Sequence, residues 1–443
     1  MFWYTACKVR PKFFRRVVPK AALPRAPDPP RNASDPLHAH DQSCLVAEPF
    51  SARLKTMSVQ VRINRHGAAR VESGHPWVFQ SDVVDAGNAQ PGDVVAVLNQ
   101  QGRYLGVAHY SAASQITLRF LSRKQEMVDG AFWHDRLSRA LKHRSWVVEH
   151  SNAYRLVFAE ADGLPGLIVD RYGDYLVIQT LTQGMDRAKA EIVAALTELL
   201  SPKGVVERND SAVRLKENLP QQSSVLAGEI PNPVMLAMNG LRLEANLLEG
   251  QKTGVFLDQR ENYLAAARWT KGQALDLFTS TGGFALHMAS KADAVEAVDS
   301  SERALASAMR NRDANGITNI KFREADVLNS LAGYAAGGRR FDTIVVDPPA
   351  FAKSKQHLAA AEPAYLDLNR RALSLLNPGG VLITCSCSQH MSESKLLDMI
   401  ALASLETGRP LRVLERRMQA LDHPVLLTVP ETLYLKCVIF ERI

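Results

Sequence analysis

From Lys271 onward, short apolar runs alternate with segments of helix length, and this alternation constrains the fold more than any other feature of the chain. The predicted strands are residues 274–278, 294–299, 320–323, 343–347 and 380–384. Repeated strand-and-helix units form a parallel, doubly wound sheet, because each helix returns the chain to the edge where the next strand begins. Ligands of such sheets bind at the carboxyl ends of the strands. We therefore expect the chemistry of this α/β region there.

Three segments precede this region. Residues 1–57 are rich in proline and lack apolar periodicity, so we expect either a disordered extension or a wrongly assigned start, with Met57 as the true first residue. Residues 58–130 contain short β-branched and aromatic runs separated by turns, which predicts a small β-barrel. Residues 131–245 predict a central α+β domain, and residues 246–443 the doubly wound domain.

Composition excludes several classes of protein. The five cysteines show no repeated CxxC spacing, which argues against a disulfide framework or a structural zinc site and favours a reducing, cytoplasmic location without a metal. No run approaches the roughly 18 apolar residues of a membrane span. The formal net charge is +7, but residues 1–56 hold ten Lys or Arg and four Asp or Glu. Basicity is therefore weak evidence for a nucleic acid partner.

The first predicted strand of this region leads into segment 276–284, DLFTSTGGF, whose small residues allow close approach of a ligand. About twenty residues later Asp299 ends the next strand, where a carboxylate can hold two ribose hydroxyls. The three glycines of a dinucleotide motif are absent, so a nucleoside cofactor without a pyrophosphate fits better. The alternative is that Gly282 and Gly283 only make a tight turn.

Acidic residues also follow the third and fourth strands. Asp326 is placed either to contact an adenine amino group or to cap a helix. Asp347 precedes Pro348 and Pro349, which impose a rigid extended backbone. A rigid polar strand end of this kind can bind the edge of a flipped base while Phe351 stacks on its face. The alternative is a plain Pro-Pro strand terminator.

Cys387 follows the fifth strand at the same edge of the sheet. C5 of cytosine is a poor nucleophile until a group adds to C6, and a thiolate can make that addition. Methylation of a nitrogen needs no such cysteine. An isolated cysteine is more often a small buried apolar residue, so the hypothesis rests on the pairing of Cys387 with Asp347.

At these residues the chain resembles class I S-adenosylmethionine methyltransferases, and specifically the ribosomal RNA large-subunit methyltransferase I family of cytosine C5 enzymes. The similarity runs from about Ser58 to the C-terminus. The segments that carry it are 74–79 (GHPWVF), 160–166 (EADGLPG), 252–260 (KTGVFLDQR), 278–284 (FTSTGGF), 347–349 (DPP), 386–388 (SCS), 422–424 (DHP) and 433–436 (LYLK).

The resemblance implies a PUA domain that grips RNA, a central domain and a Rossmann-like methyltransferase domain. It also implies ribosomal RNA as substrate and S-adenosyl-L-methionine as donor. Cys387 would attack C6, and Asp347 would hold the cytosine beside Pro348 and Phe351. The residues that would contact the donor are Asp276, Phe278, Ser280, Gly282, Gly283, Asp299, Asp326 and Gln259. For segment 258–260, clamping the donor and capping a helix are both left open, as is a homodimer.

Two positions depart from the family pattern. Ala350 stands where members often carry lysine, and Lys353 or Lys355 could replace that contact. Cys385 stands where an aromatic residue is common, and alternation along an extended chain predicts that it points to the same side as Cys387. We interpret Cys385 as a neutral substitution rather than a redox partner or an aid to product release.

Two further residues and two further functions remain from the sequence. His423 and Lys436 could touch RNA but are left out of the catalytic set. The alternative functions are N-methylation of a purine amine in ribosomal RNA, which Asp-Pro-Pro and an aromatic residue also suit, and a non-catalytic RNA-binding assembly factor.

Overall fold

The computed structural model describes residues 59–250, 254–351 and 358–443. The predictions for residues 1–57 and for Lys353 and Lys355 lie outside the described residues. Within those three ranges, no helix is both long enough and apolar enough to cross a bilayer.

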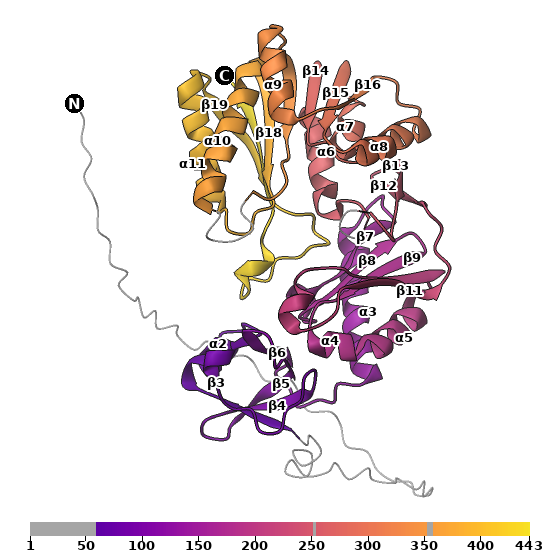
Figure 1. The fold of residues 1–443 in the computed structure, drawn as a ribbon, viewed down its shortest axis with the longest axis vertical. Coiled ribbons are helices and arrows are strands. Elements are labelled where there is room, and N and C mark those ends of the chain that lie inside the picture. The colour runs from indigo at the N-terminus through magenta and orange to yellow at the C-terminus, as the bar shows by residue number, and fades with distance from the viewer. Residues whose placement is uncertain (1–58, 251–253, 352–357) are drawn as a thin grey trace, which may run out of the picture. The chain divides into compact units, whose positions relative to one another are not determined.

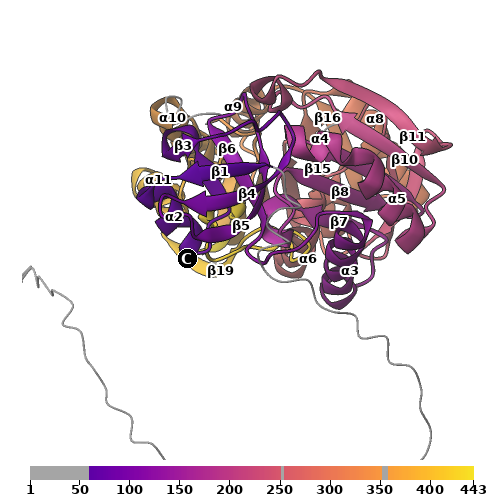
Figure 2. The same ribbon diagram turned by 90° about the horizontal axis from the view of Figure 1, so that it is seen from below.

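The first sheet has six strands in the order β2-β6-β5-β4-β1-β3. Their bounds are β1 Gln60–Ile63, β2 Trp77–Phe79, β3 Val83–Asp85, β4 Val94–Asn99, β5 Tyr104–Tyr110 and β6 Ile116–Ser122. Helix α2 (Arg65–Glu72) packs against β2 and β5 (Figure 2) and was not predicted. Its start is fixed by Asn64, whose side chain accepts a hydrogen bond from the Gly67 amide at 2.8 Å. The predicted small β domain is confirmed, with one added helix.

The second sheet has five strands in the order β11-β10-β9-β8-β7. Its strands are β7 Ala153–Phe158, β8 Leu167–Tyr172, β9 Tyr175–Thr180, β10 Gly204–Asn209 and β11 Gln222–Gly228. Helix α3 (Gly130–Val147) precedes it, and two helices, α4 (Gln183–Arg187) and α5 (Lys189–Leu200), connect β9 to β10. A two-stranded ribbon, β12 (Val234–Met238) and β13 (Leu241–Ala245), follows.

The third sheet has seven strands in the order β16-β15-β14-β17-β18-β20-β19 (Figure 1). The strands are β14 Gln273–Leu277, β15 Ala294–Asp299, β16 Ile320–Glu324, β17 Phe341–Val346, β18 Leu376–Ser386, β19 Leu411–Arg417 and β20 Lys436–Arg442. The first five are parallel, and β20 runs antiparallel to β18 and β19. Its helices are α6 Arg260–Trp269, α7 Gly283–Met288, α8 Glu302–Ala314, α9 Val327–Ala336, α10 Leu358–Leu375 and α11 Glu393–Thr407.

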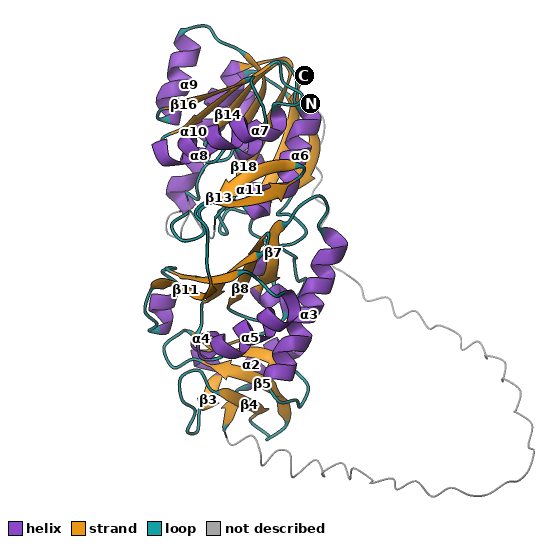
Figure 3. Ribbon diagram, turned by 90° about the vertical axis from the view of Figure 1, so that its right-hand side faces the viewer, coloured by secondary structure: helices purple, strands orange, loops and turns teal. Residues whose placement is uncertain are grey.

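Helices cover both faces of this sheet (Figure 3). Alternate residues of β18 show the division, because Ile383 belongs to the apolar cluster that includes Tyr263 of α6, whereas Leu382 belongs to the cluster that includes Tyr365 of α10. The predicted doubly wound α/β fold is therefore confirmed. The chain passes outward from β14 to β16 and returns to β17 on the other side of β14. This reversal opens a crevice at the carboxyl ends of β14 and β17, where such folds bind ligands.

Candidate active site

A cavity of about 260 Å³ lies at the carboxyl ends of the central strands of the seven-stranded sheet; we call it the sheet-end cavity. Its walls hold seven of the residues singled out from the sequence: Gln259, Phe278, Ser280, Asp299, Asp347, Pro348 and Cys387. These residues come from four strand ends and the segment before α6. The predicted catalytic pair thus lies in one cavity with half of the predicted donor-binding residues.

The turn after β14 has an unusual backbone. Phe278 and Ser280 have φ angles of 64° and 50°, values that side chains other than glycine rarely adopt. Such strain clusters at functional sites. Gly282 has a φ of 87°, and a Cβ at Gly283 would lie 2.4 Å from the Tyr263 ring. The glycine pair is therefore needed for the turn and for packing, and neither glycine lines the cavity.

Asp299 connects β15 to this turn. Its Oδ2 accepts a hydrogen bond from the Ser280 amide at 2.9 Å, and its Oδ1 accepts one from the Ser301 amide at 2.9 Å. Because each carboxylate oxygen can accept two hydrogen bonds, Asp299 keeps capacity for hydroxyl groups on the cavity side. Two amides hold this carboxylate in place before any ligand arrives.

Asp276 is fully buried and does not line the cavity. Its Oδ2 accepts hydrogen bonds from the Thr279 hydroxyl at 2.6 Å and the Ala285 amide at 3.0 Å, whereas Oδ1 has no partner among the described residues. Burial raises the pKa of Asp276 to about 7, and the charge of Asp347 acts in the same direction. Asp276 therefore links the turn to α7 through its hydrogen bonds, although burial leaves its carboxyl group poorly solvated.

Like Asp276 and the glycine pair, two further predicted residues lie outside the cavity walls. Asp326 is exposed and caps α9, accepting a hydrogen bond from the Asn329 amide at 2.9 Å. Phe351 packs edge-on against Tyr365, with ring centroids 5.0 Å apart. The helix-cap alternative for Asp326 is the arrangement that the structure has, and contacts of these two residues with donor or base stay predictions.

Gln259 connects Asp347 to the protein interior. Its Nε2 donates a hydrogen bond to Asp347 Oδ2 at 3.1 Å, and its Oε1 accepts one from Asn262 Nδ2 at 2.7 Å. Gln259 is the residue that precedes α6, but its side chain makes no cap bond. A contact of segment 258–260 with the donor stays a prediction. Sequence reasoning missed Asn262, because no local pattern links it to a strand end 85 residues away.

The two residues beside Cys387 are fixed from one side. The Tyr365 hydroxyl lies 2.8 Å from Ser386 Oγ and 3.3 Å from Ser388 Oγ. Because side chains alternate along an extended chain, holding both serines on the α10 side turns Cys387 toward the other side. Cys387 is half-buried and lines the sheet-end cavity.

Cys385 is buried and is absent from the walls of the sheet-end cavity. It pairs in register with Cys437 of β20 and lies in the same apolar cluster. Burial raises the pKa of the Cys385 thiol well above its usual range. A thiol of this kind is a poor nucleophile at neutral pH, because the thiolate is the reactive form.

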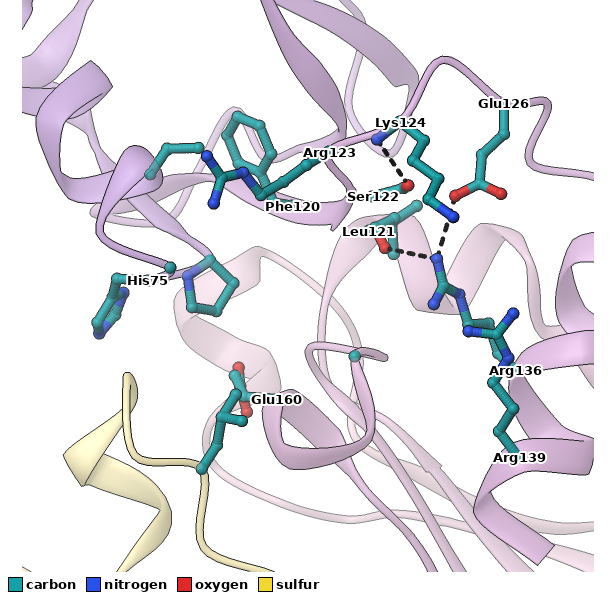
Figure 4. Close-up of a pocket in the computed structure, with 15 residues that line it drawn as sticks. His75, Phe120, Leu121, Ser122, Arg123, Lys124, Glu126, Arg136, Arg139 and Glu160 are labelled. Atoms are coloured by element: carbon teal, nitrogen blue, oxygen red, sulfur yellow. Dashed lines mark hydrogen bonds and ion pairs between the residues drawn. The ribbon is translucent and has the colours of Figure 1, made fainter. Parts of the chain in front are cut away.

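A second hollow of about 340 Å³ shares no lining residue with the sheet-end cavity. Figure 4 shows this hollow, which we call the basic hollow. Four cations are among its lining residues: Arg123, Lys124, Arg136 and Arg139. Segments 74–79 and 160–166 meet here, where the Trp77 indole nitrogen donates to Glu160 Oε1 at 3.0 Å. Glu126 offsets part of the charge by pairing with Arg136 at 3.1 Å. An excess of cations suits a polyanion.

Family models match two parts of the chain. A PUA-like domain matches residues 61–123, which hold the six-stranded sheet, and a methyltransferase domain matches residues 270–417. The first match agrees with the domain type implied by the sequence resemblance. The second covers most of the seven-stranded sheet and its strand-end turns.

Curated relatives match over most of the chain. The ribosomal RNA large subunit methyltransferase I of Shewanella denitrificans is 38% identical over 390 residues, which is 86% of this chain and 98% of the relative. The protein of the same name from Escherichia coli strain SMS-3-5 is 37% identical over the same shares. An inferred SAM-dependent methyltransferase from Streptococcus mutans has a similar solved structure, with a TM-score of 0.74, 22% identity, and coverage of 86% of this chain and 100% of that one.

Proposed function

Because the chain belongs to the ribosomal RNA large subunit methyltransferase I family, we propose that it forms 5-methylcytosine in large-subunit ribosomal RNA through a Cys387 adduct. The observation that carries the cytosine C5 assignment is that Cys387 and Asp347 line one cavity at the sheet switch point. A thiol in that place is what C5 chemistry needs and what methylation of an amine does not.

The methyl donor is S-adenosyl-L-methionine, and the cavity residues fit it. The Asp299 carboxylate, held by two amides, suits the two ribose hydroxyls, and the rings of Phe278 and Phe284 supply an apolar wall. When bound, the donor supplies a methyl group on a sulfonium, which is a strong electrophile. Gln259 holds Asp347 through a hydrogen bond, and we assign it this role instead of a contact with the donor.

The chain's own residues activate the cytosine. The Cys387 thiolate adds to C6, so that an S–C6 bond forms and the C5=C6 electron pair makes C5 nucleophilic. Asp347, oriented by Gln259, hydrogen-bonds the N3 side of the base and stabilises the charge that develops there. After C5 carries the methyl group, a base removes the C5 proton. The C5=C6 bond then re-forms and the S–C6 bond breaks, which regenerates the thiolate.

The RNA substrate requires contacts beyond the flipped base. Cations of the basic hollow suit phosphate groups, and the PUA-like domain lies on one side of that hollow through Phe120 and Arg123. These contacts would orient the RNA by shape and charge and leave the sheet-end cavity to select the base. We place this activity in the cytoplasm, where large-subunit RNA of a bacterial cell resides.

The test is transfer of labelled methyl from S-adenosyl-L-methionine to deproteinised large-subunit ribosomal RNA, followed by nucleoside analysis. Wild type and the matched control Cys385→Ala should form 5-methylcytosine, and Cys387→Ala should not. Continued methylation by Cys387→Ala, or a methylated purine amine as product, would replace the C5 assignment by N-methylation. Failure of the wild type to bind the donor would favour the non-catalytic assembly factor.

A further inference from the structure

Lys436 opens β20 and is buried, with 7% of its surface exposed. It pairs in register with Ser386, the residue before Cys387. Its Nζ donates hydrogen bonds to the Ser388 carbonyl at 2.6 Å and to the Tyr434 carbonyl at 2.8 Å. The ammonium group is thus anchored to the backbone one residue from the proposed nucleophile.

The bonding partners of Lys436 are neutral. Across the three described ranges, Nζ forms no ion pair with a carboxylate, and the Glu393 carboxylate, which approaches from the start of α11, is bonded to Arg416 at 2.7 Å. A buried cation with only carbonyl partners is poorly compensated, and its field acts strongly on nearby groups. Cys387 is one such group, because it precedes Ser388, whose carbonyl accepts the hydrogen bond from Nζ.

Asp347 makes such a cation necessary. Its carboxylate shares the sheet-end cavity with Cys387, and a second negative charge there opposes ionisation of the thiol. The pKa of Tyr365 is raised first by burial and further by Cys387 and Asp347, so the charges of both groups act at this spot. A nearby cation would offset this opposition.

The titration of Lys436 agrees with this role. Burial lowers the pKa of Lys436 to about 8, while the charge of Cys387 acts in the opposite direction. Electrostatic interaction is mutual, so an ammonium favoured by the thiolate also favours the thiolate. Below pH 8 the ammonium form prevails, which covers the neutral range in which the enzyme would work.

We propose that Lys436 is a positioning residue that keeps Cys387 in the thiolate form and fixes the backbone after it. The proposal rests on Cys387 being the nucleophile. The titratable or charged groups around this pair fall into two sets. Those near Cys387 are Asp258, Tyr263, Asp299 and Asp347 in the cavity wall, and Tyr365 from α10. Those near Lys436 are Glu393 from α11 and Arg416 and Arg417 from β19. Arg416 and Arg417 are paired with Glu393 and Glu415, so Lys436 is the cation of this set that has no carboxylate partner among the described residues.

The experiment measures the rate of iodoacetamide alkylation of Cys387 against pH, with the modified residue identified by peptide mass spectrometry. We compare the full-length wild type with Lys436→Met, Lys436→Gln and Lys436→Arg. Met and Gln remove the charge, and Gln keeps a donor for the Ser388 carbonyl. We expect the pH midpoint of Cys387 alkylation to rise by about one to two units in both neutral variants. In Lys436→Arg, which keeps the positive charge, the midpoint should stay close to that of wild type.

Buried Cys385 and Cys437 serve as internal controls, because their alkylation would report unfolding of a variant. If either Lys436→Met or Lys436→Gln is unfolded by this criterion, the other variant provides the same test. An unchanged midpoint in a folded neutral variant would overturn the proposal. The reaction uses neither RNA nor methyl donor, so this failure is distinct from methylation by Cys387→Ala, which would instead remove the proposed function.

Discussion

Two buried aspartates of the same domain, Asp276 and Asp422, are held in opposite ways. Burial alone would raise the pKa of Asp422, but His423, Arg260 and the Arg155 amide hold it at about 2. Oδ2 accepts from the Arg155 amide at 2.8 Å, and Oδ1 lies 3.3 Å from Arg260 Nη2. Asp276 has two hydrogen bonds to one oxygen, none to the other among the described residues, and a pKa of about 7.

The difference separates two uses of a buried charge. Asp422 ties together segments far apart in sequence, because its side chain bonds to β7 and α6 and its carbonyl accepts from Arg144 of α3 at 2.9 Å. Both carboxylate oxygens of Asp422 have partners, and these bonds stabilise the fold. The region around Asp276 combines an unsatisfied acceptor with positive φ angles, which is expected where a ligand completes the site.

The largest expected effect is on the cavity side of this comparison. Asp347→Asn should lower the rate of methyl transfer roughly 10²- to 10⁴-fold, because an amide cannot carry the charge or proton that the cytosine needs. Affinity for S-adenosylhomocysteine, measured by calorimetry, and the melting temperature should change little. A rate within tenfold of wild type would remove Asp347 from the catalytic set.

On the structural side, Asp422→Asn should lower the free energy of unfolding by about 3 kcal/mol, because the buried Arg260 guanidinium loses its buried anion and keeps only the more exposed Glu261. Urea unfolding measures this value. The matched control is Glu431→Gln, which breaks a partly exposed pair with His75 and should change stability by less than about 1 kcal/mol. Equal effects of the two substitutions would erase the distinction drawn for Asp422.

The dependence of stability on acidic pH should also report on the Asp422 carboxyl group. The folded pKa of Asp422 lies below its ordinary value of 3.8, so its contribution is complete above about pH 4 and is lost as pH falls toward 2. The loss should reach roughly 2 kcal/mol. Unfolding measured from pH 5 to 2 should show this decline in wild type, and Asp422→Asn should lack that part of it. If Asp422→Asn loses as much stability between pH 5 and 2 as wild type does, another group causes the acid sensitivity.

Replacing Asp276 by Asn should change the free energy of unfolding in the opposite direction. The folded pKa of Asp276 is raised to about 7, so the penalty for the buried carboxylate is absent below about pH 4 and complete above pH 7. Asp276→Asn should therefore raise the free energy of unfolding at pH 8 by about 1 kcal/mol. Donor affinity should fall by up to about tenfold, because a neutral amide accepts weaker hydrogen bonds from Thr279 and Ala285 and holds the turn that lines the cavity less firmly. Destabilisation at pH 8 would show that Asp276 serves the fold as Asp422 does.

The sequence predicts most of the seven-stranded sheet, because its buried parallel strands are continuous apolar runs such as 343–347 and each is followed by a helix. Strands β3, β10 to β13, β19 and β20 were not predicted. β19 has a polar pattern, LRVLERR, and pairs with β20 only through the folded edge of the sheet. Helix α2 is too short for periodicity to show and depends on its Asn64 cap.

The candidate site also contains residues that the sequence predicts and contacts that it does not. Residues that follow strands, such as Asp299 and Asp347, are predictable because parallel strands bring their ends together. The bonds of Gln259 to Asp347 and of Lys436 to Ser388 join segments 88 and 48 residues apart. Such contacts depend on tertiary packing. A local pattern cannot therefore separate Lys436, which supports the site, from a lysine that touches RNA.

The most direct test of the Cys387 adduct uses substrate RNA in which cytidine is replaced by 5-fluorocytidine. Fluorine at C5 cannot leave as a proton does, so the S–C6 bond should persist after methyl transfer. With S-adenosyl-L-methionine, wild type and Cys385→Ala should form a covalent RNA complex that survives denaturation and maps to Cys387 by peptide mass spectrometry. No complex, or one attached to another residue, would contradict the C5 mechanism.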